Sequence, residues 1–201
     1  MSPRLAVVGP RLGVVGGTFD PIHNGHLLLA RSVSEAMSLD NVLFIPAANP
    51  PHKDHRTDIA ASTCRWTMVE LALEGIADFE ASRDELDRPG HSYTVDTLRQ
   101  LHLRHPEAEI FLIIGADNTH DLSTWHEPES ILELCTVVAG SRSVSLAHDT
   151  DPIAAKVCTV DTPVIDISST QIRQRLRAGL PVHSMMPEKV AAYIYERGLY
   201  S

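Results

Sequence analysis

Long apolar runs, closely spaced cysteines and an excess of basic charge are all absent from this 201-residue chain. Its longest apolar runs fall far short of the roughly 18 residues that a membrane-spanning helix requires, and no signal peptide is evident, so we expect no membrane partner. The three cysteines, Cys64, Cys135 and Cys158, form no CxxC pair, which favours reduced core side chains in a cytoplasmic protein over a disulfide framework. Acidic residues outnumber basic ones by 26 to 17, and the formal net charge of −9 argues against a nucleic-acid partner.

Both common phosphate-binding patterns are absent as well. No two glycines stand two positions apart, which excludes the GxGxxG fingerprint, and no lysine follows a glycine, which excludes a P-loop. The hydrophobic fraction of 43% and the charged fraction of 21% nevertheless indicate a folded chain with a sizeable core. A phosphate site in this protein must therefore use another design.

The stretch GGTFDPIHNGHL, residues 16–27, offers such a design. It follows a short apolar run and leads into a longer one, so we expect a strand, a glycine turn and a helix. Gly16 and Gly17 let the backbone approach a phosphate closely, and a helix start offers unpaired N–H groups at the positive end of its dipole. His23 and His26 can face the same way there and donate to the same oxygens. We predict a nucleotide-phosphate site; a metal site is the weaker interpretation, because no third ligand follows at zinc spacing.

Strand-length apolar runs alternate with helical patterns along the rest of the chain, although residues 141–161 show no clear pattern. We expect strands at residues 12–15, 41–46, 77–82, 110–114, 136–139 and 164–167, and helices at 27–37, 59–74, 93–103, 128–134, 168–178 and 187–197. This alternation predicts the α/β class with a doubly wound parallel sheet. We expect one domain over residues 11–201 and an N-terminal extension over residues 1–10, where RLAVVGP nearly repeats RLGVVGG.

A second polar segment, ISSTQIRQRLRAG, occupies residues 167–179. Ser168 and Gln171 fit a capping box, and an ordinary capped helix is the simpler interpretation of this segment alone. Three hydroxyls at its start, from Ser168, Ser169 and Thr170, and Arg173 one turn further in favour a cradle for a polyphosphate.

The predicted sheet offers a place where such groups can meet. Ligands of doubly wound sheets bind beyond the carboxyl ends of the strands, where the strand order reverses. The first strand ends in the glycine turn and the fourth ends at Asp117. If these two strands are neighbours, one crevice lies between them and Asp117 can accept hydrogen bonds from ribose hydroxyls; an N-cap for the next turn is an equally good interpretation of Asp117.

The two polar segments resemble the signatures of the HxGH nucleotidyltransferase superfamily. Together with PPHK (residues 50–53), DELDRPGHSYTVDTLRQL (84–101), IGADN (114–118), Trp125 and VAAYIYERGLY (190–200), the set resembles the bacterial nicotinate mononucleotide adenylyltransferases. The resemblance covers nearly everything from Leu12 onward. The chain departs from it in the ten-residue extension and in Met185-Met186-Pro187, where the family more often has a run similar to Leu-Val-Pro.

The resemblance implies a Rossmann-like nucleotidyltransferase fold with C-terminal helices, and adenylyl transfer from ATP to nicotinate mononucleotide in NAD biosynthesis. It implies catalytic roles for His23, His26 and Arg173. The implied ATP-binding residues are Gly16, Gly17, Thr18, Phe19, His23, His26, Asp117, Ser168, Ser169, Thr170 and Arg173. No acidic cluster that could hold a metal is evident, so we expect Mg²⁺ to be carried by the ATP phosphates and water.

For the acceptor, the resemblance implies Lys53, Thr94 and Trp125. A helix beginning at Ser92 or Thr94 offers N–H donors to the nicotinate carboxylate, and Trp125 in its polar loop can stack on the pyridine ring, although a core tryptophan is the alternative. Alternative functions are adenylyl transfer to nicotinamide mononucleotide or phosphopantetheine, the activity of a cytidylyltransferase of the same superfamily, or a nucleotide-sensing module without turnover. The sequence leaves open whether the protein forms a homo-oligomer.

Overall fold

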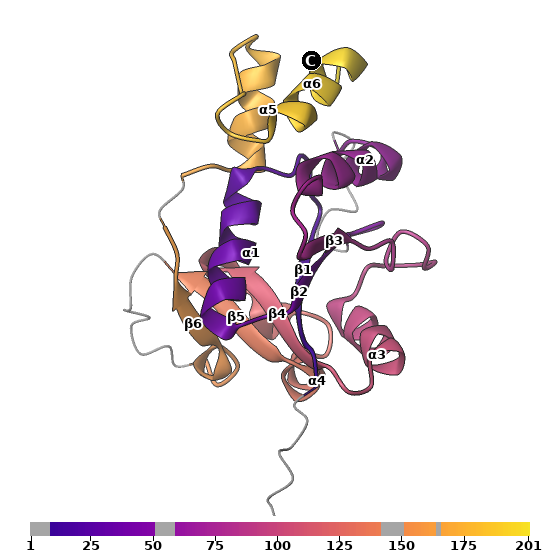
Figure 1. Cartoon of the computed structure of the whole chain (residues 1–201), viewed down its shortest axis with the longest axis vertical. Helices are drawn as coiled ribbons and strands as arrows, with labels where there is room; N and C mark the ends of the chain where they lie inside the picture. Colours follow the sequence, from indigo (N-terminus) through magenta and orange to yellow (C-terminus); the bar gives the residue numbers. More distant parts are fainter. Residues whose placement is uncertain (1–8, 51–58, 142–150, 164–165) are drawn as a thin grey trace, which may run out of the picture.

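The computed structural model describes residues 9–50, 59–141, 151–163 and 166–201 (Figure 1). These residues form a parallel sheet of six strands in the order β3-β2-β1-β4-β5-β6. The strands are β1 (Arg11–Gly17), β2 (Asn41–Pro46), β3 (Phe79–Ala81), β4 (Glu109–Gly115), β5 (Thr136–Ser141) and β6 (Cys158–Asp161). The predicted α/β class with a doubly wound parallel sheet is therefore confirmed.

The order of the strands reverses between β1 and β4. The chain runs outward from β1 through β2 to β3, then returns to the centre and runs outward again from β4 through β5 to β6. β1 and β4 are direct neighbours, with Leu12 opposite Ile110 and Val14 opposite Leu112. β1 and β4 are thus neighbours, as the predicted crevice requires.

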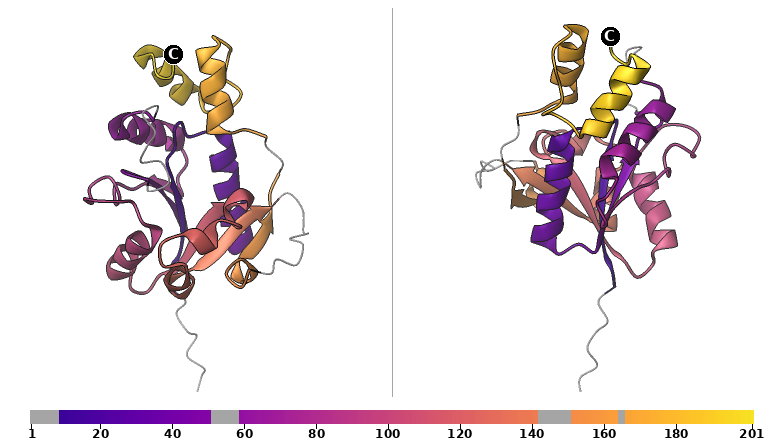
Figure 2. Two further views of the ribbon diagram at one scale, coloured as in Figure 1. Left: turned by 180° about the vertical axis from the view of Figure 1, so that it is seen from behind. Right: turned by 45° about the horizontal axis from the view of Figure 1, so that its top comes forward.

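Helices cover both faces of this sheet. They are α1 (Asn24–Met37), α2 (Ser62–Leu73), α3 (Thr94–Arg104), α4 (Pro128–Leu134), α5 (Ser169–Arg177) and α6 (Glu188–Arg197). Figure 2 shows α1 and α3 on opposite sides of the sheet, and α5 and α6 together at one end of the molecule, near α1 and α2. Among the described residues, none of the helices is long and apolar enough to cross a membrane.

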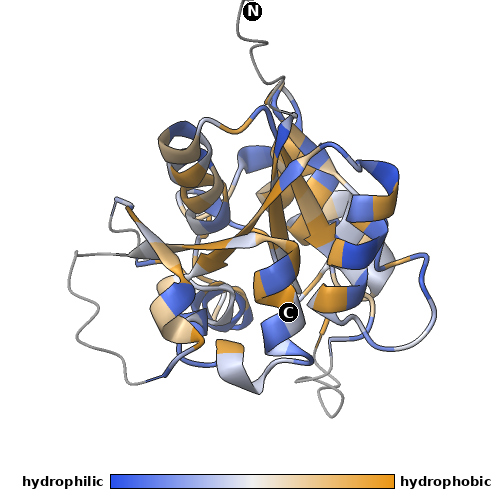
Figure 3. Ribbon diagram, turned by 90° about the horizontal axis from the view of Figure 1, so that it is seen from below, coloured by the Kyte–Doolittle hydropathy of each residue, from blue (hydrophilic) through white to orange (hydrophobic). Residues whose placement is uncertain are grey.

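Two hydrophobic cores follow from the alternation of side chains along each strand. Val15 packs into a cluster with residues of α1, α2, α5 and α6, whereas its neighbour Val14 packs into a second cluster with residues of α3 and α4. The strands β1, β2, β4 and β5 are accordingly apolar along most of their length, while the helices carry both polar and apolar residues (Figure 3). This pattern is typical of a parallel sheet that is buried on both faces.

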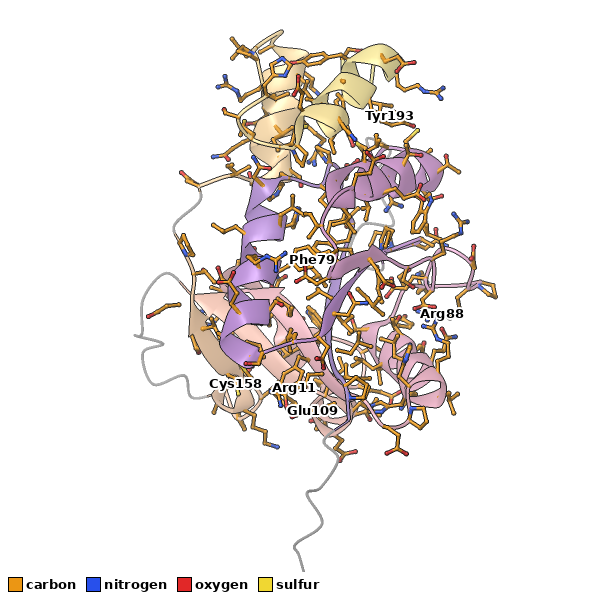
Figure 4. The ribbon with its side chains drawn as sticks, in the orientation of Figure 1. Arg11, Phe79, Arg88, Glu109, Cys158 and Tyr193 are labelled. Carbon is orange, nitrogen blue, oxygen red and sulfur yellow. The ribbon has the colours of Figure 1, made fainter. Side chains whose placement is uncertain are left out.

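The amino ends of the central strands lie opposite the end that carries the glycine turn. There Arg11 and Glu109 form an ion pair at 2.6 Å (Figure 4). The backbone N–H of Glu109 also donates to the carbonyl of Pro10 at 2.9 Å. Residues 1–8 of the proposed extension lie outside the described residues, so the domain limits stay a prediction.

The last strand was predicted at the wrong place. The sixth strand is β6, in the segment without a clear pattern, whereas Asp166 and Ile167 are not in a strand, and residues 164 and 165 lie outside the described residues. The physical reason is that β6 is an edge strand. Cys158, Thr159 and Asp161 are exposed, so β6 has no apolar run to mark it.

Candidate active site

A cavity of about 1040 Å³ opens at the carboxyl ends of β1 and β4. Residues from both halves of the sheet line it, as expected for a site at the point where the strand order reverses. Ten of the predicted site residues are among those that line it: Gly16, Gly17, Thr18, His23, His26, Thr94, Asp117, Trp125, Ser168 and Ser169. The fold thus brings together segments that are up to about 150 residues apart in the sequence.

The two histidines lie at the first turn of α1. His23 is the N-cap, with extended backbone, and the imidazole rings of His23 and His26 stack with their centroids 3.7 Å apart. The backbone N–H of His23 donates to Nδ1 of His26 at 3.1 Å. Because Nδ1 of His26 accepts this bond, a neutral His26 ring carries its proton on Nε2, which can donate to a ligand. Phe19 packs edge-on against the His26 ring at 5.1 Å.

Burial determines the charge of His23. Its side chain is 6% exposed, and desolvation lowers its pKa from 6.5 to about 4. At neutral pH this imidazole is therefore uncharged and can act as a hydrogen-bond donor without bringing a charge. Positive potential at the cavity then has to come from the helix N-termini and from guanidinium groups nearby.

The N-terminus of α5 forms another wall of the cavity. Ser168 and Gln171 form the predicted capping box: Ser168 Oγ accepts from the Gln171 N–H at 3.2 Å, and Gln171 Oε1 accepts from the Ser168 N–H at 2.9 Å. The hydroxyl of Ser169 donates to the carbonyl of Pro21 at 2.9 Å. The second polar segment is thus bonded directly to the loop that precedes α1.

Three predicted ATP-binding residues, Phe19, Thr170 and Arg173, are not among the residues that line the cavity. Arg173 is 5% exposed, and its Nη1 donates to the carbonyl of Asp20 at 2.7 Å. Its Nη2 donates to Thr170 Oγ1 at 3.3 Å. Arg173 thus packs against the loop that precedes α1, and its predicted contact with phosphate stays a prediction.

The acceptor side combines α3 with the loop that contains Trp125. Thr94 is the first residue of α3, and Trp125 is half-buried, packing against the core on the α3 side while also lining the cavity. The position of Trp125 is thus compatible with both predictions, a side chain packed in the core and a side chain that faces a ligand. Asp117 lies within a short turn whose N-cap is Gly115, so Asp117 is not the N-cap. Lys53 lies outside the described residues.

Two buried charged residues beside the cavity were not singled out from the sequence. Arg65, on α2, is 2% exposed, and its Nη1 donates to the carbonyls of Thr18 at 2.8 Å and Ala47 at 2.7 Å. Glu85 lines the cavity and accepts from Thr97 Oγ1 at 2.7 Å; burial raises its pKa. No local signal distinguishes Arg65 from other helical arginines, whereas Glu85 belongs to a stretch that the resemblance already covers.

Known proteins are similar to this chain in sequence and in fold. A Cytidylyltransferase-like family model matches residues 14–175. A protein of Thermus thermophilus, named probable nicotinate-nucleotide adenylyltransferase, is 44% identical over 190 residues, which cover 94% of this chain and 99% of that protein. A protein of the same name from Corynebacterium kroppenstedtii is 42% identical over 193 residues, covering 95% of this chain and 91% of that one.

Among solved structures, Plasmodium falciparum nicotinic acid mononucleotide adenylyltransferase complexed with NaAD has a TM-score of 0.76 to this chain. The match covers 95% of this chain and 97% of that one at 17% identity, so it establishes the shared fold alone. The family rests on the sequence matches, which extend over almost the whole chain. The chain therefore belongs to the Cytidylyltransferase-like family of nucleotidyltransferases and, within it, to the nicotinate-nucleotide adenylyltransferases.

Proposed function

We propose that this protein transfers the adenylyl group of ATP to nicotinate mononucleotide, giving deamido-NAD and pyrophosphate. One observation carries the proposal: a single cavity is lined by the histidine pair, the N-terminus of α5, Asp117 and the start of α3 with Trp125. Its volume of about 1040 Å³ suits two nucleotides lying end to end. The alternative of a binding module without turnover is less favoured, because both histidines line the cavity.

In this reaction the phosphate oxygen of the mononucleotide attacks the α-phosphorus of ATP in line. A new P–O bond forms, the bond to the bridging oxygen breaks, and pyrophosphate leaves with the electron pair. No covalent bond to the protein is needed, so the protein has to align the reactants and stabilise developing charge. Imidazole N–H groups of His23 and His26 would donate to the α- and β-phosphate oxygens.

The remaining phosphate groups would be held by backbone and hydroxyl donors. Gly16, Gly17 and Thr18 would hold phosphate near the end of β1, and the N-terminus of α5 with Ser168 and Ser169 would hold the departing pyrophosphate. Arg173 would serve this site through the loop to which it is bonded. ATP would enter as its Mg²⁺ complex; among the described residues no three His, Cys, Asp or Glu side chains gather as a protein-held metal would require.

Acceptor choice follows from the donors at the start of α3. Backbone N–H groups near Thr94 would receive the nicotinate carboxylate, which presents only acceptors. A nicotinamide would turn its own N–H donors toward them, and each such mismatch costs about 1–3 kcal/mol. Trp125 would stack on the pyridine ring, and Lys53 would be a further acceptor-binding residue. All three free cysteines and the nature of the substrates agree with a reaction in the cytoplasm.

Pyrophosphate release from Mg-ATP tests the proposal, with nicotinate mononucleotide, nicotinamide mononucleotide and phosphopantetheine compared side by side. We expect release with nicotinate mononucleotide and much less with the other two acceptors. His23→Ala should lower the rate by about 10²–10³, the typical cost of losing one transition-state donor. No release with either pyridine nucleotide, or near-full activity in His23→Ala, would contradict the proposal.

A further inference from the structure

The loop between β1 and α1, residues 18–23 (the histidine loop), is held by side chains from distant parts of the chain. Three of its backbone carbonyls accept bonds from buried or half-buried donors. Arg65 of α2 donates to Thr18, Arg173 of α5 to Asp20, and Ser169 of α5 to Pro21. The loop itself carries no regular secondary structure, so these bonds define its path.

Asp20 is the centre of this arrangement. Its side chain is 3% exposed, and Oδ2 lies 3.6 Å from Arg173 Nη1. Its Oδ1 accepts two hydrogen bonds, one from the N–H of Ala60 at 3.0 Å and one from the hydroxyl of Tyr200 at 2.7 Å. Tyr200 is the penultimate residue of the chain, 180 positions from Asp20. The C-terminal segment is thus bonded to the loop that ends at His23 and leads into the first turn of α1, where His26 lies.

Two further observations indicate that this contact is not incidental packing. Tyr200 has a φ of +67°, in the left-handed region that a tyrosine rarely occupies. Its hydroxyl also remains a donor at any physiological pH, because burial and the neighbouring Asp20 charge raise its pKa. A strained backbone that delivers a permanent donor to a buried carboxylate points to a functional constraint on the last turn of the chain.

The charges beneath the histidine loop do not cancel. Arg65 and Arg173 contribute two buried guanidinium groups, while Asp20 contributes one carboxylate. If the Asp20 carboxylate rotated toward solvent or toward the cavity, it would bring negative charge nearer to the bound phosphates. The Tyr200 bond holds the Asp20 carboxylate in its buried position beside Arg173, and Asp20 is not among the residues that line the cavity.

We propose that Tyr200 is a positioning residue for adenylyl transfer, whose hydroxyl fixes the Asp20 carboxylate and thereby the path of the histidine loop. It touches neither substrate and acts through Asp20 on the placement of His23 and His26. This inference rests on the proposed function. It assigns a role in the reaction to the C-terminal residues, which lie outside both polar segments.

Tyr200→Phe tests this by removing the hydroxyl and keeping the ring that packs on the core. We expect kcat to fall about tenfold, which corresponds to the loss of one positioned hydrogen bond, and KM for nicotinate mononucleotide to stay unchanged, since the acceptor wall is untouched. Tyr195→Phe is the matched control, because Tyr195 lies on α6 with 47% of its surface exposed. Rates are compared at a temperature at which circular dichroism shows every variant fully folded.

A double-mutant cycle with Asp20→Ala, which removes the acceptor of the Tyr200 hydroxyl, separates positioning from general weakening of the fold. If Tyr200 acts through Asp20, Tyr200→Phe should change kcat little in the Asp20→Ala background. Removal of Ser201 alone should leave activity at the wild-type level, whereas removal of residues 200–201 should match Tyr200→Phe or exceed it. Wild-type kcat in Tyr200→Phe, or equal losses with and without Asp20, would overturn the inference. Inactivity of the wild-type protein would instead overturn the proposed function.

Discussion

The chemistry of the cavity depends on a few residues whose environment departs from the ordinary. His23 is 6% exposed and its ring stacks on that of His26, so a positive charge on the buried His23 ring would be costly. We therefore expect His23 to contribute an oriented N–H donor and no charge at neutral pH. Gly16, by contrast, presents bare backbone to the cavity, and a Cβ there would meet nothing within 4 Å.

The stability of the protein should depend on pH through the titration of His23. The pKa of His23 is about 4 when folded and 6.5 when unfolded, so between these values the unfolded chain binds the proton first. The free energy of unfolding should therefore fall by about 3 kcal/mol as pH drops from 6.5 to 4. Above pH 6.5, the neutral His23 should make its full contribution to stability. Urea unfolding of the wild type and His23→Asn across this range measures it. Equal pH slopes in the two proteins would contradict the prediction.

Gly16→Ala provides a second prediction at this scale. The added methyl group has room in the folded protein but occupies space into which a phosphate would approach the backbone, so we expect unchanged stability and about tenfold weaker binding of Mg-ATP. Calorimetric titration and thermal melting measure the two effects. Gly13→Ala should instead lower the stability and leave Mg-ATP binding unchanged, because its Cβ would lie 2.8 Å from Leu39 Cδ1. Unchanged Mg-ATP affinity in Gly16→Ala would show that no phosphate approaches this residue.

At the scale of elements, helices position the site by holding loops as well as by offering their N-termini. α5 contributes its capped first turn to the cavity and its buried face to the histidine loop. α2 contributes no ligand, yet Arg65 at its first turn joins the loop after β1 to the loop after β2. A single guanidinium group thus fixes the relative positions of two walls of the cavity.

Arg65→Met should lower the free energy of unfolding by about 3 kcal/mol, because it leaves several buried carbonyls without a donor. Chemical denaturation of purified protein measures this loss. The control is Arg99→Met on α3, whose ion pair with Glu127 is exposed and whose loss should leave stability unchanged. A loss of less than about 1 kcal/mol in Arg65→Met would show that the carbonyls find other partners.

For the whole molecule, the decisive feature is that β1 and β4 are neighbours although their first residues, Arg11 and Glu109, are 98 positions apart in the sequence. The cavity at their carboxyl ends depends on both halves of the sheet and on the C-terminal helices. A ligand there contacts segments that separate on unfolding, so its binding free energy should add to the stability of the entire fold.

Mg-ATP at about 100 times its dissociation constant should therefore stabilise the protein by about 2.7 kcal/mol and raise the melting temperature by about 5–10 °C. Nicotinate mononucleotide should by itself also raise the melting temperature. Trp125→Ala should lose the shift with nicotinate mononucleotide and keep the one with Mg-ATP. Loss of both shifts, or of neither, would contradict the assignment of Trp125 to the acceptor alone.

Local patterns in the sequence were sufficient for much of this architecture. Apolar periodicity indicated the parallel sheet, and the capping box at Ser168 and Gln171 was confirmed as predicted. The order of the motifs, with the first strand ending in the glycine turn and the fourth at Asp117, located the cavity once β1 and β4 were neighbours. These features depend on backbone geometry and on residues close in sequence, so they can be recognised without the fold. The roles assigned to individual site residues stay predictions.

Other features depend on contacts over long sequence distances, and only the tertiary structure decided them. Arg173 reaches Asp20 across 153 positions, and Tyr200 reaches it across 180. Whether an arginine on a helix faces a ligand or a buried carbonyl depends on which face packs against which loop, and no local pattern encodes this. The exposed edge strand β6 escaped recognition for the same reason, because its place comes from pairing with β5 rather than from its own apolar content.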